Sequence, residues 1–248
     1  MRYRLIRQRS FPAAMNMALD EAIAESVKAG RSLPTIRFYG WEPSAISIGY
    51  FQSLENEVDL EACRKAGVEW VRRRTGGGAV YHDASGEITY SIIGPEEHFP
   101  RDILKSYEQV CGILIRGLER LGMAARFSPI NDVLVDGKKI SGNAQTRRHG
   151  ILLQHGTLLY AVDVKRMFAL LKVSKEKISD KLIQSVKKRV TSISQHTAAS
   201  KEEVLRALEA AFGDGRDTEI GDYTAEELAR AGELVKEKYA TRSWNALR

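Results

Sequence analysis

This sequence of 248 residues has little cysteine and no long hydrophobic run, and each shortage excludes a class of protein. Its two cysteines, Cys63 and Cys111, are too few for a disulfide framework and lack the spacing of a metal site. No apolar stretch approaches the roughly 18 residues of a membrane span, and the basic N-terminal segment lacks the apolar core of a signal peptide. We therefore expect a cytoplasmic protein that works in a reducing compartment without a membrane partner.

The remaining composition is that of a globular protein with a basic surplus. Hydrophobic residues make up 43% of the chain, which is enough for a sizeable core and argues against disorder. The net charge of +6 indicates an anionic partner, such as a nucleotide triphosphate or an acidic protein. Because the basic residues are spread along the chain, with short clusters only at 72–74 and 187–189, we do not expect a nucleic-acid partner.

Hydrophobic periodicity and turn signals predict a fold of the α+β class. Helices are expected at 15–29, 58–66, 104–121, 163–172, 174–187, 201–212 and 224–239. Strands are expected at 35–39, 45–50, 68–73, 87–93, 131–135 and 138–141, with a further pair of strand segments within 150–162. The pair Asp136-Gly137 is typical of a two-residue hairpin turn. Since strands and helices follow no regular βαβ rhythm, we predict a central mixed sheet flanked by helices.

Three successive glycines, Gly76 to Gly78, form the most informative segment. They follow a predicted strand, with three arginines before them at 72–74 and His82-Asp83 after them. Glycine allows a backbone to approach a ligand closely, and a turn of exposed N–H groups suits phosphate oxygens. The alternative is a flexible turn beside a solvated basic strand end, but the flanking arginines favour an anion site. The spacing matches neither a Walker loop nor a dinucleotide fingerprint.

A second group of polar residues surrounds the predicted hairpin. Lys138 and Lys139 are adjacent in an extended strand, so their side chains point to opposite faces and one of them can enter a site. A lysine there can bridge a carboxylate and a phosphate. The alternative is an edge strand whose lysines oppose aggregation. The small residues from Ser141 to Ala144 favour the site, because they suit close packing against a ligand.

The histidines and cysteines give weaker signals. His155 lies in an apolar strand, where a histidine is more often a hydrogen-bonded core residue than a catalyst. His82, beside the glycines, is better placed for ligand contact. Cys63 and Cys111 lie at helical positions and are expected to be small core residues. No pairing of a nucleophile with a base is evident in the sequence.

Five motifs follow one another along the chain. They are FPAAMNMALDEA at 11–22, RRRTGGGAVYHD at 72–83, IND at 130–132, KKISGNAQ at 138–145 and LLQHGTLL at 152–159. In this order they make the chain similar to lipoate–protein ligases of the biotin/lipoate ligase superfamily. The resemblance implies a catalytic domain at 1–212 and a short helical tail at 213–248, with no full accessory domain. It also implies ATP-dependent chemistry with Mg²⁺, in which lipoate becomes lipoyl-AMP and is then transferred to an acceptor lysine.

By matching positions, the resemblance implies that Lys139 is the catalytic lysine and contacts both the carboxylate and the α-phosphate. Asp132 is implied to hold Mg²⁺ as well as to contact the nucleotide. The other residues implied to bind the nucleotide or lipoyl-AMP are Arg73, Gly76, Gly77, Gly78, Ala79, Val80, Tyr81, His82, Asn131, Gly142, Asn143, Ala144, His155, Gly156 and Thr157.

The resemblance also implies partners. The acceptor would be a lipoyl domain of a 2-oxoacid dehydrogenase complex or the glycine-cleavage H protein. The short tail resembles that of archaeal-type ligases whose accessory domain is a separate polypeptide, so we expect a small accessory protein as a second partner.

Two alternatives share this fold. Octanoyl- or lipoyl-transferases have the same glycine run and lysine, but use a cysteine thioester in place of ATP. Residues 126–138 contain no cysteine, which favours the ligase because the transferase chemistry would lack its nucleophile. The other alternative is a non-catalytic module that binds lipoyl proteins.

Overall fold

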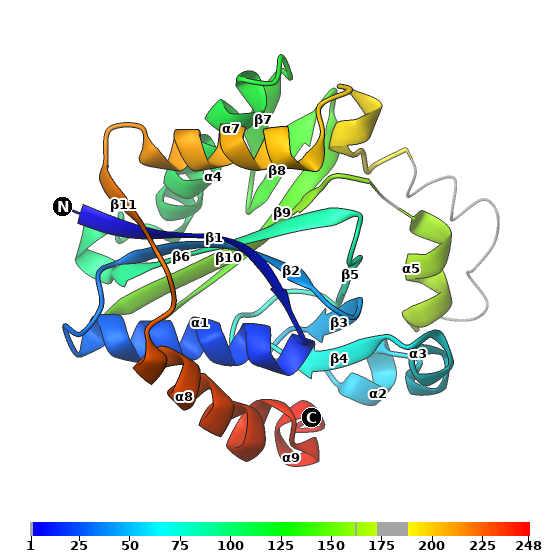
Figure 1. The fold of residues 1–248 in the computed structure, drawn as a ribbon. Helices are drawn as coiled ribbons and strands as arrows, with labels where there is room; N and C mark the ends of the chain where they lie inside the picture. The colour runs from blue at the N-terminus through cyan, green and yellow to red at the C-terminus, as the bar shows by residue number, and fades with distance from the viewer. Residues whose placement is uncertain (1, 162, 173–187) are drawn as a thin grey trace.

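The computed structural model describes residues 2–161, 163–172 and 188–248, and two sheets organise it (Figure 1). The larger sheet has eight strands in the order β11-β1-β2-β6-β10-β9-β8-β7. Their bounds are β1 Arg2–Phe11, β2 Thr35–Trp41, β6 Glu87–Pro95, β7 Ala125–Ser128, β8 Asp132–Val135, β9 Lys138–Arg148, β10 Ile151–Leu159 and β11 Asp217–Gly221. The smaller sheet, β4-β3-β5, contains β3 Ala45–Ile48, β4 Glu69–Arg72 and β5 Val80–His82.

The larger sheet is mixed, as predicted. β1 pairs in parallel with β2 and β11, whereas each neighbouring pair from β2 through β6, β10, β9 and β8 to β7 is antiparallel. Helix α1 (Ala13–Lys28) covers one face, and α4 (Ile103–Glu119) and α7 (Lys201–Gly213) cover the other (Figure 1). Helices α2 (Leu54–Glu57), α3 (Leu60–Ala66) and α5 (Val164–Leu170) lie beside the smaller sheet, while α8 (Ala225–Leu234) packs on α1 and leads to α9 (Arg242–Asn245).

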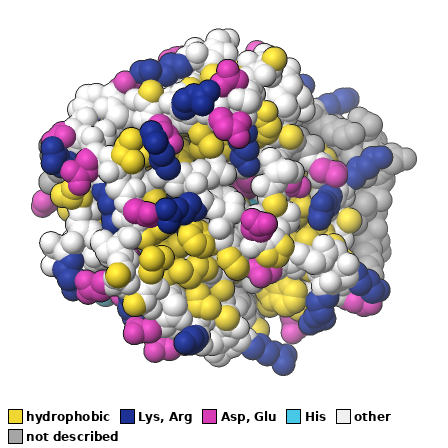
Figure 2. All heavy atoms as spheres, in the orientation of Figure 1, with side chains coloured by type: hydrophobic (Ala, Val, Ile, Leu, Met, Phe, Trp, Pro, Cys, Tyr) yellow, Lys and Arg dark blue, Asp and Glu magenta, His cyan; other side chains and the backbone are white. Residues whose placement is uncertain are grey.

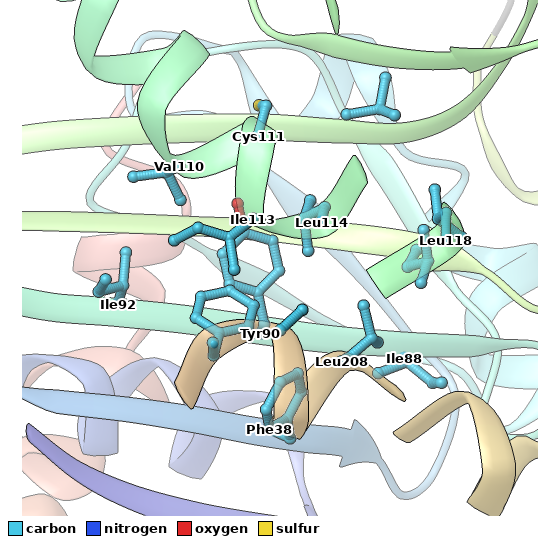
Figure 3. Packing of buried hydrophobic residues seen from close by; sticks show 14 of the residues in the cluster. Phe38, Ile88, Tyr90, Ile92, Val110, Cys111, Ile113, Leu114, Leu118 and Leu208 are labelled. Carbon is cyan, nitrogen blue, oxygen red and sulfur yellow. The ribbon is translucent and has the colours of Figure 1, made fainter. Parts of the chain in front are cut away.

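The central strands are buried on both faces. All seven residues of β2 are buried, and their side chains alternate between two cores. Ile36 and Phe38 face the core beneath α4 and α7, whereas Tyr39 and Trp41 face α1. Figure 3 shows this first core, with Phe38 near Tyr90 and Leu208, and with Cys111 and other residues of α4 in the same cluster. Cys111 is fully buried in that core and Cys63 in the core of the smaller sheet, which confirms both as core residues.

Most of the predicted elements are present, and the differences have physical reasons. The hairpin turn is confirmed, because Asp136 and Gly137 have φ values of 50° and 73°, as this turn type requires. The pair of segments predicted at 150–162 is wrong, since β10 is one continuous strand. The helix predicted at 174–187 lies outside the described residues.

Four strands were not predicted, and one of them, β5, has only three residues. β1 carries charged side chains on its exposed positions, β7 is only four residues long, and β11 is a mostly exposed edge strand. β11 pairs with β1, so the segment after residue 212 contributes a strand to the main sheet in addition to helices. The predicted capping box at Thr224 and Glu227 does begin α8.

Positive and negative side chains are intermixed on the surface. Figure 2 shows basic and acidic groups interspersed over the visible face instead of separated by sign. Exposed ion pairs such as Arg9 with Asp222, at 2.6 Å, contribute to this pattern. No helix among the described residues is both long enough and apolar enough to cross a bilayer.

One ion pair is fully buried between α1 and the sheet. The Arg37 guanidinium lies 2.8 Å from Asp20 Oδ1 and also donates hydrogen bonds to Asn16 and to the Tyr223 hydroxyl. Asp20 in turn accepts a hydrogen bond from Ser91 of β6. The network therefore fixes α1 against two strands.

Replacing Arg37 by Ala should lower the free energy of unfolding by about 3–5 kcal/mol, because the Asp20 carboxylate would remain buried without its cation. The matched control is Arg2→Ala, whose exposed pairs with Asp217 and Glu219 should contribute less than about 1 kcal/mol. Urea unfolding of both variants measures the difference. Equal small effects would show that the buried pair does not stabilise the fold.

Candidate active site

A cavity of about 360 Å³ lies where the glycine segment meets β9 and β10. This size is typical of a small-molecule site. The structure brings most of the predicted site residues together in its wall. These are Arg73, Gly77, Gly78, Ala79, Val80, Tyr81, His82, Asn131, Lys139, Gly142, Asn143, Ala144, His155, Gly156 and Thr157. Gly76 and Asp132 do not line the cavity, but each contacts a residue that does.

The three arginines expected to contact an anion are instead engaged by the protein. Arg72 donates to backbone carbonyls of Gly49, Tyr50 and Gln52 and to those of Trp244 and Asn245. It thereby ties the C-terminal segment to the smaller sheet. Arg74 lies 3.4 Å from Glu21 of α1. Only Arg73 lines the cavity.

Arg73 holds the glycine segment in place. Its Nη2 donates to the carbonyls of Gly76 and Gly78, both at 2.8 Å, and its Nε donates to Thr75 Oγ1 at 3.1 Å. Its Nη1 donates to the carbonyl and hydroxyl oxygens of Ser47 in β3, at 3.0 and 3.2 Å. Burial lowers the pKa of Arg73 to about 10, so it stays charged at neutral pH. No carboxylate of the described residues forms a salt bridge with it, which favours negative charge in the cavity.

Two glycines allow the segment to fold this way. Gly77 has a φ of +97°, which favours glycine. At Gly49, at the end of β3, a Cβ atom would lie 1.9 Å from the Gly77 carbonyl oxygen. Any other residue at position 49 would therefore displace the glycine segment. Among the described residues, no acceptor receives a hydrogen bond from the amides of Gly77 and Gly78, so these donors are open to a ligand.

Lys139 reaches the cavity from the opposite wall. Its Nζ lies 2.7 Å from Asp132 Oδ1, and its side chain passes so close to Gly142 that a Cβ there would meet Nζ at 2.7 Å. Lys138 does not line the cavity, so only one of the adjacent lysines enters the site. Asp132 is engaged by a cation, and the described residues contain no group of three or more His, Cys, Asp or Glu side chains suited to a metal.

Amide and hydroxyl groups fix the strand beneath Lys139. The Asn143 side chain donates to the Asn131 carbonyl at 2.8 Å and accepts from the Tyr90 hydroxyl at 2.7 Å. Asn131 donates in return to the Asn143 carbonyl. Gly156 of β10 lies against this pair, since a Cβ there would meet Asn143 Oδ1 at 2.0 Å. This part of the wall is therefore rigid and closely packed.

Both predicted histidines are hydrogen-bonded and buried. His155 lies between Thr75 Oγ1, at 2.7 Å, and Asp20 Oδ2, at 3.3 Å, and burial lowers its pKa. The expectation of a hydrogen-bonded core histidine is confirmed, although the ring also lines the cavity. His82 lies between Ser47 Oγ at 2.8 Å and Glu87 Oε1 at 2.7 Å.

Neither cysteine belongs to the site. Both are absent from the cavity wall, and burial raises the pKa of Cys63 to about 11 and of Cys111 to about 12. A thiol with so high a pKa supplies very little thiolate at neutral pH. Neither thiol is therefore placed or activated to act as a nucleophile in this cavity.

Several functional side chains were missed by the sequence reasoning. Ser47, Trp41, Glu87 and Thr89 all line the cavity. The available signal was the alternation of side chains along a strand. Ser47 is the polar residue within the apolar strand AISI, and Glu87 and Thr89 lie on the same face of β6. Only the pairing of the strands shows that these positions meet.

Comparison with known proteins places these features in a family. Residues 12–213 match the family model described as the lipoyl protein ligase A/B catalytic domain. The octanoyltransferase LipM of Brevibacillus brevis is 36% identical, with 99% of each chain covered. Seven further curated relatives, 34–37% identical, carry the same name.

Solved structures of ligases have the same fold. A bi-partite lipoate protein ligase from Thermoplasma acidophilum aligns with a TM-score of 0.89 at 35% identity, covering 99% of this chain and 96% of that one. A lipoate-protein ligase A bound with ATP aligns with a TM-score of 0.85 at 32% identity, covering 99% of each chain.

These relatives correct the function inferred from the sequence. The ATP-dependent lipoate ligase reaction is wrong as the main interpretation, because the curated relatives that match the whole chain are octanoyltransferases. The chain is similar both to curated octanoyltransferases and to solved ligases, so the resemblance identified the fold and not the reaction. The chain belongs to the lipoyl protein ligase A/B catalytic-domain family.

Proposed function

We propose that this protein is an octanoyltransferase that moves an octanoyl group from a thioester to the ε-amine of a lysine in an acceptor protein. In the net reaction the C–S bond of the thioester breaks, an amide bond to the lysine forms, and the proton lost by the amine appears on the released thiol. The thioester already carries an activated acyl group, so the transfer needs no ATP. The observation that carries the proposal is a cavity that joins an apolar wall to two cations, in a chain whose curated relatives are named for this activity.

The apolar wall suits the acyl chain. Met17, Trp41, Leu159, Val164 and Met167 line the cavity from α1, β2, β10 and α5. An eight-carbon chain placed among them would be buried away from water, and each buried methylene contributes roughly 0.8 kcal/mol to the free energy of binding. The affinity for the acyl group therefore comes mainly from this wall.

The polar wall suits the reacting carbonyl. Attack on a thioester places negative charge on the carbonyl oxygen, and fixed donors stabilise it. Lys139 and the amides of Gly77 and Gly78 lie in the cavity wall and supply such donors, and Arg73 adds its positive charge. The Lys139 ammonium can leave Asp132 for the oxyanion, since its side chain is 42% exposed.

The acceptor is a lipoyl-domain protein under this proposal. The Thermoplasma acidophilum ligase was solved as part of a lipoylation system that includes an E2 lipoyl domain. A chain of the same fold would present the acyl group to the lysine of a domain of this kind. The accessory protein expected from the sequence has no step in the transfer.

The test is acceptor mass after incubation with an octanoyl thioester of a pantetheine carrier protein, without ATP. A purified lipoyl domain should gain one octanoyl group, and a domain with its acceptor lysine replaced should gain none. The double variant Cys63→Ala/Cys111→Ala should transfer equally well, because neither thiol lines the cavity. Octanoylation only from free octanoate and ATP would contradict the proposal, and a folded but inactive double variant would show that a cysteine carries the acyl group.

Replacing Lys139 by Ala should lower the rate of transfer about 10²–10³-fold, because one donor to the developing oxyanion is lost. The matched control is Lys138→Ala, which removes the neighbouring charge outside the cavity and should leave the rate nearly unchanged. Initial rates of acceptor octanoylation measure both variants. Similar rates for the two would show that Lys139 is misassigned.

A further inference from the structure

Ser47, His82 and Glu87 form a continuous hydrogen-bonded chain in the cavity wall. Ser47 Oγ lies 2.8 Å from His82 Nε2, and His82 Nδ1 lies 2.7 Å from Glu87 Oε1. The side chains come from β3, β5 and β6, and all three residues line the cavity. They are only 2–3% exposed, so bulk water does not compete for these bonds. This order of groups, hydroxyl to imidazole to carboxylate, is the arrangement that activates a serine for acyl transfer.

The surrounding hydrogen bonds determine which atom donates and which accepts at each contact. The Glu87 carboxylate accepts a hydrogen bond, so His82 Nδ1 carries its proton and Nε2 is left to accept one. Arg73 Nη1 donates to Ser47 Oγ at 3.2 Å, which leaves the serine proton to point at His82. The hydroxyl is therefore a donor to the base, as a nucleophile requires.

The imidazole is also held rigidly. The Trp41 indole stacks on the His82 ring, with centroids 4.0 Å apart and planes 14° apart. Trp41 Nε1 donates to Thr89 Oγ1 at 2.8 Å, and Thr89 donates to Glu87 Oε1 at 2.7 Å. The carboxylate and the ring thus have little freedom to turn away from Ser47.

A second hydrogen-bonded chain of hydroxyl, imidazole and carboxylate differs in its hydrogen-bond length, in its shared carboxylate and in its position relative to the cavity. Thr75, His155 and Asp20 are linked, but the His155–Asp20 separation is 3.3 Å and Asp20 is shared with Arg37. Neither Thr75 nor Asp20 lines the cavity. This second chain supports the wall, whereas all three residues of the first line the cavity.

Resting on the acyl transfer proposed above, we propose that Ser47 carries the acyl group as an ester, in the role that cysteine cannot fill here. In the first step Ser47 Oγ attacks the thioester carbonyl and its proton passes to His82 Nε2. The C–S bond then breaks, the sulfur takes that proton from His82, and the thiol leaves. His82 is the general base and acid, and Glu87 is a positioning residue that holds its tautomer.

In the second step the neutral amine of the acceptor lysine attacks the ester carbonyl. Its proton passes to His82, the C–O bond to Ser47 breaks, and Ser47 Oγ recovers the proton from His82. The products are the octanoyl amide and the free hydroxyl of Ser47. The two steps together convert a thioester and an amine into an amide and a thiol.

The experiment uses the full chain and an octyl fluorophosphonate, a probe that bonds covalently to activated serines. Intact-mass and peptide analysis should find one adduct, on Ser47. Ser47→Ala and His82→Ala should abolish it, whereas Ser47→Cys should give a hydroxylamine-labile octanoyl thioester with the octanoyl donor. The matched control is Ser44→Ala, which removes a serine outside the cavity wall and should label like the wild type.

Kinetics give the second readout. Ser47→Ala should lower octanoyl transfer by about 10³-fold or more, and Glu87→Gln should lower kcat with KM unchanged, because the His82 tautomer changes while the cavity does not. Transfer at the wild-type rate by a folded Ser47→Ala variant would overturn the proposed ester on Ser47. It would leave the proposed octanoyltransferase function standing. An adduct on Ser47 without any transfer from the thioester would support the nucleophile and overturn the proposed reaction. If neither the adduct nor the transfer is observed, both the Ser47 ester and the octanoyltransferase function are overturned.

Discussion

The buried guanidinium of Arg73 is the interaction on which the rest of the site depends. It donates to the carbonyls of Gly76 and Gly78 on one side and to Ser47 on the other, and so joins the glycine segment to β3. A planar group with donors in a fixed fork can bridge several acceptors in this way, which a lysine ammonium cannot do with the same geometry. Since no carboxylate of the described residues neutralises Arg73, the same interaction leaves the cavity wall positive. One side chain therefore sets both the shape and the charge of the site.

Residues of several other elements hold Arg73, the glycine segment and the cavity wall in position. Gly49 gives the glycine segment room to fold back, and Arg72 fastens the C-terminal segment behind the same strand end. The buried pair of Arg37 and Asp20 fixes α1 beneath β10, from which His155 reaches the cavity wall. The opposite wall is formed by the rigid pair of Asn143 with Tyr90 under Lys139. An acyl group in the cavity would thus meet fixed polar groups on one side and apolar side chains on the other.

How much could be predicted depended on how local each feature is. The hairpin turn at Asp136-Gly137, the glycine segment and the single inward lysine were predictable, because a few neighbouring residues determine them. The roles of the three arginines were not predictable, since their partners lie on β3, α1 and the C-terminal segment. The hydroxyl–imidazole–carboxylate chain was also missed, because its serine is 35 residues from its histidine and strand pairing brings them together. The reaction could not be separated from the fold, because the chain is similar to both ligases and octanoyltransferases, and nothing local in the sequence pairs Ser47 with a base.

The most direct measurement of the central claim compares the wild type with Arg73→Lys by amide hydrogen exchange over residues 74–80, together with octanoyl transfer. The lysine keeps the charge but cannot bridge Ser47 and the two glycine carbonyls. The variant should remain folded, exchange these amides faster and lose most of its transfer rate. Exchange and transfer equal to the wild type would contradict the role of Arg73 as the organiser of the site.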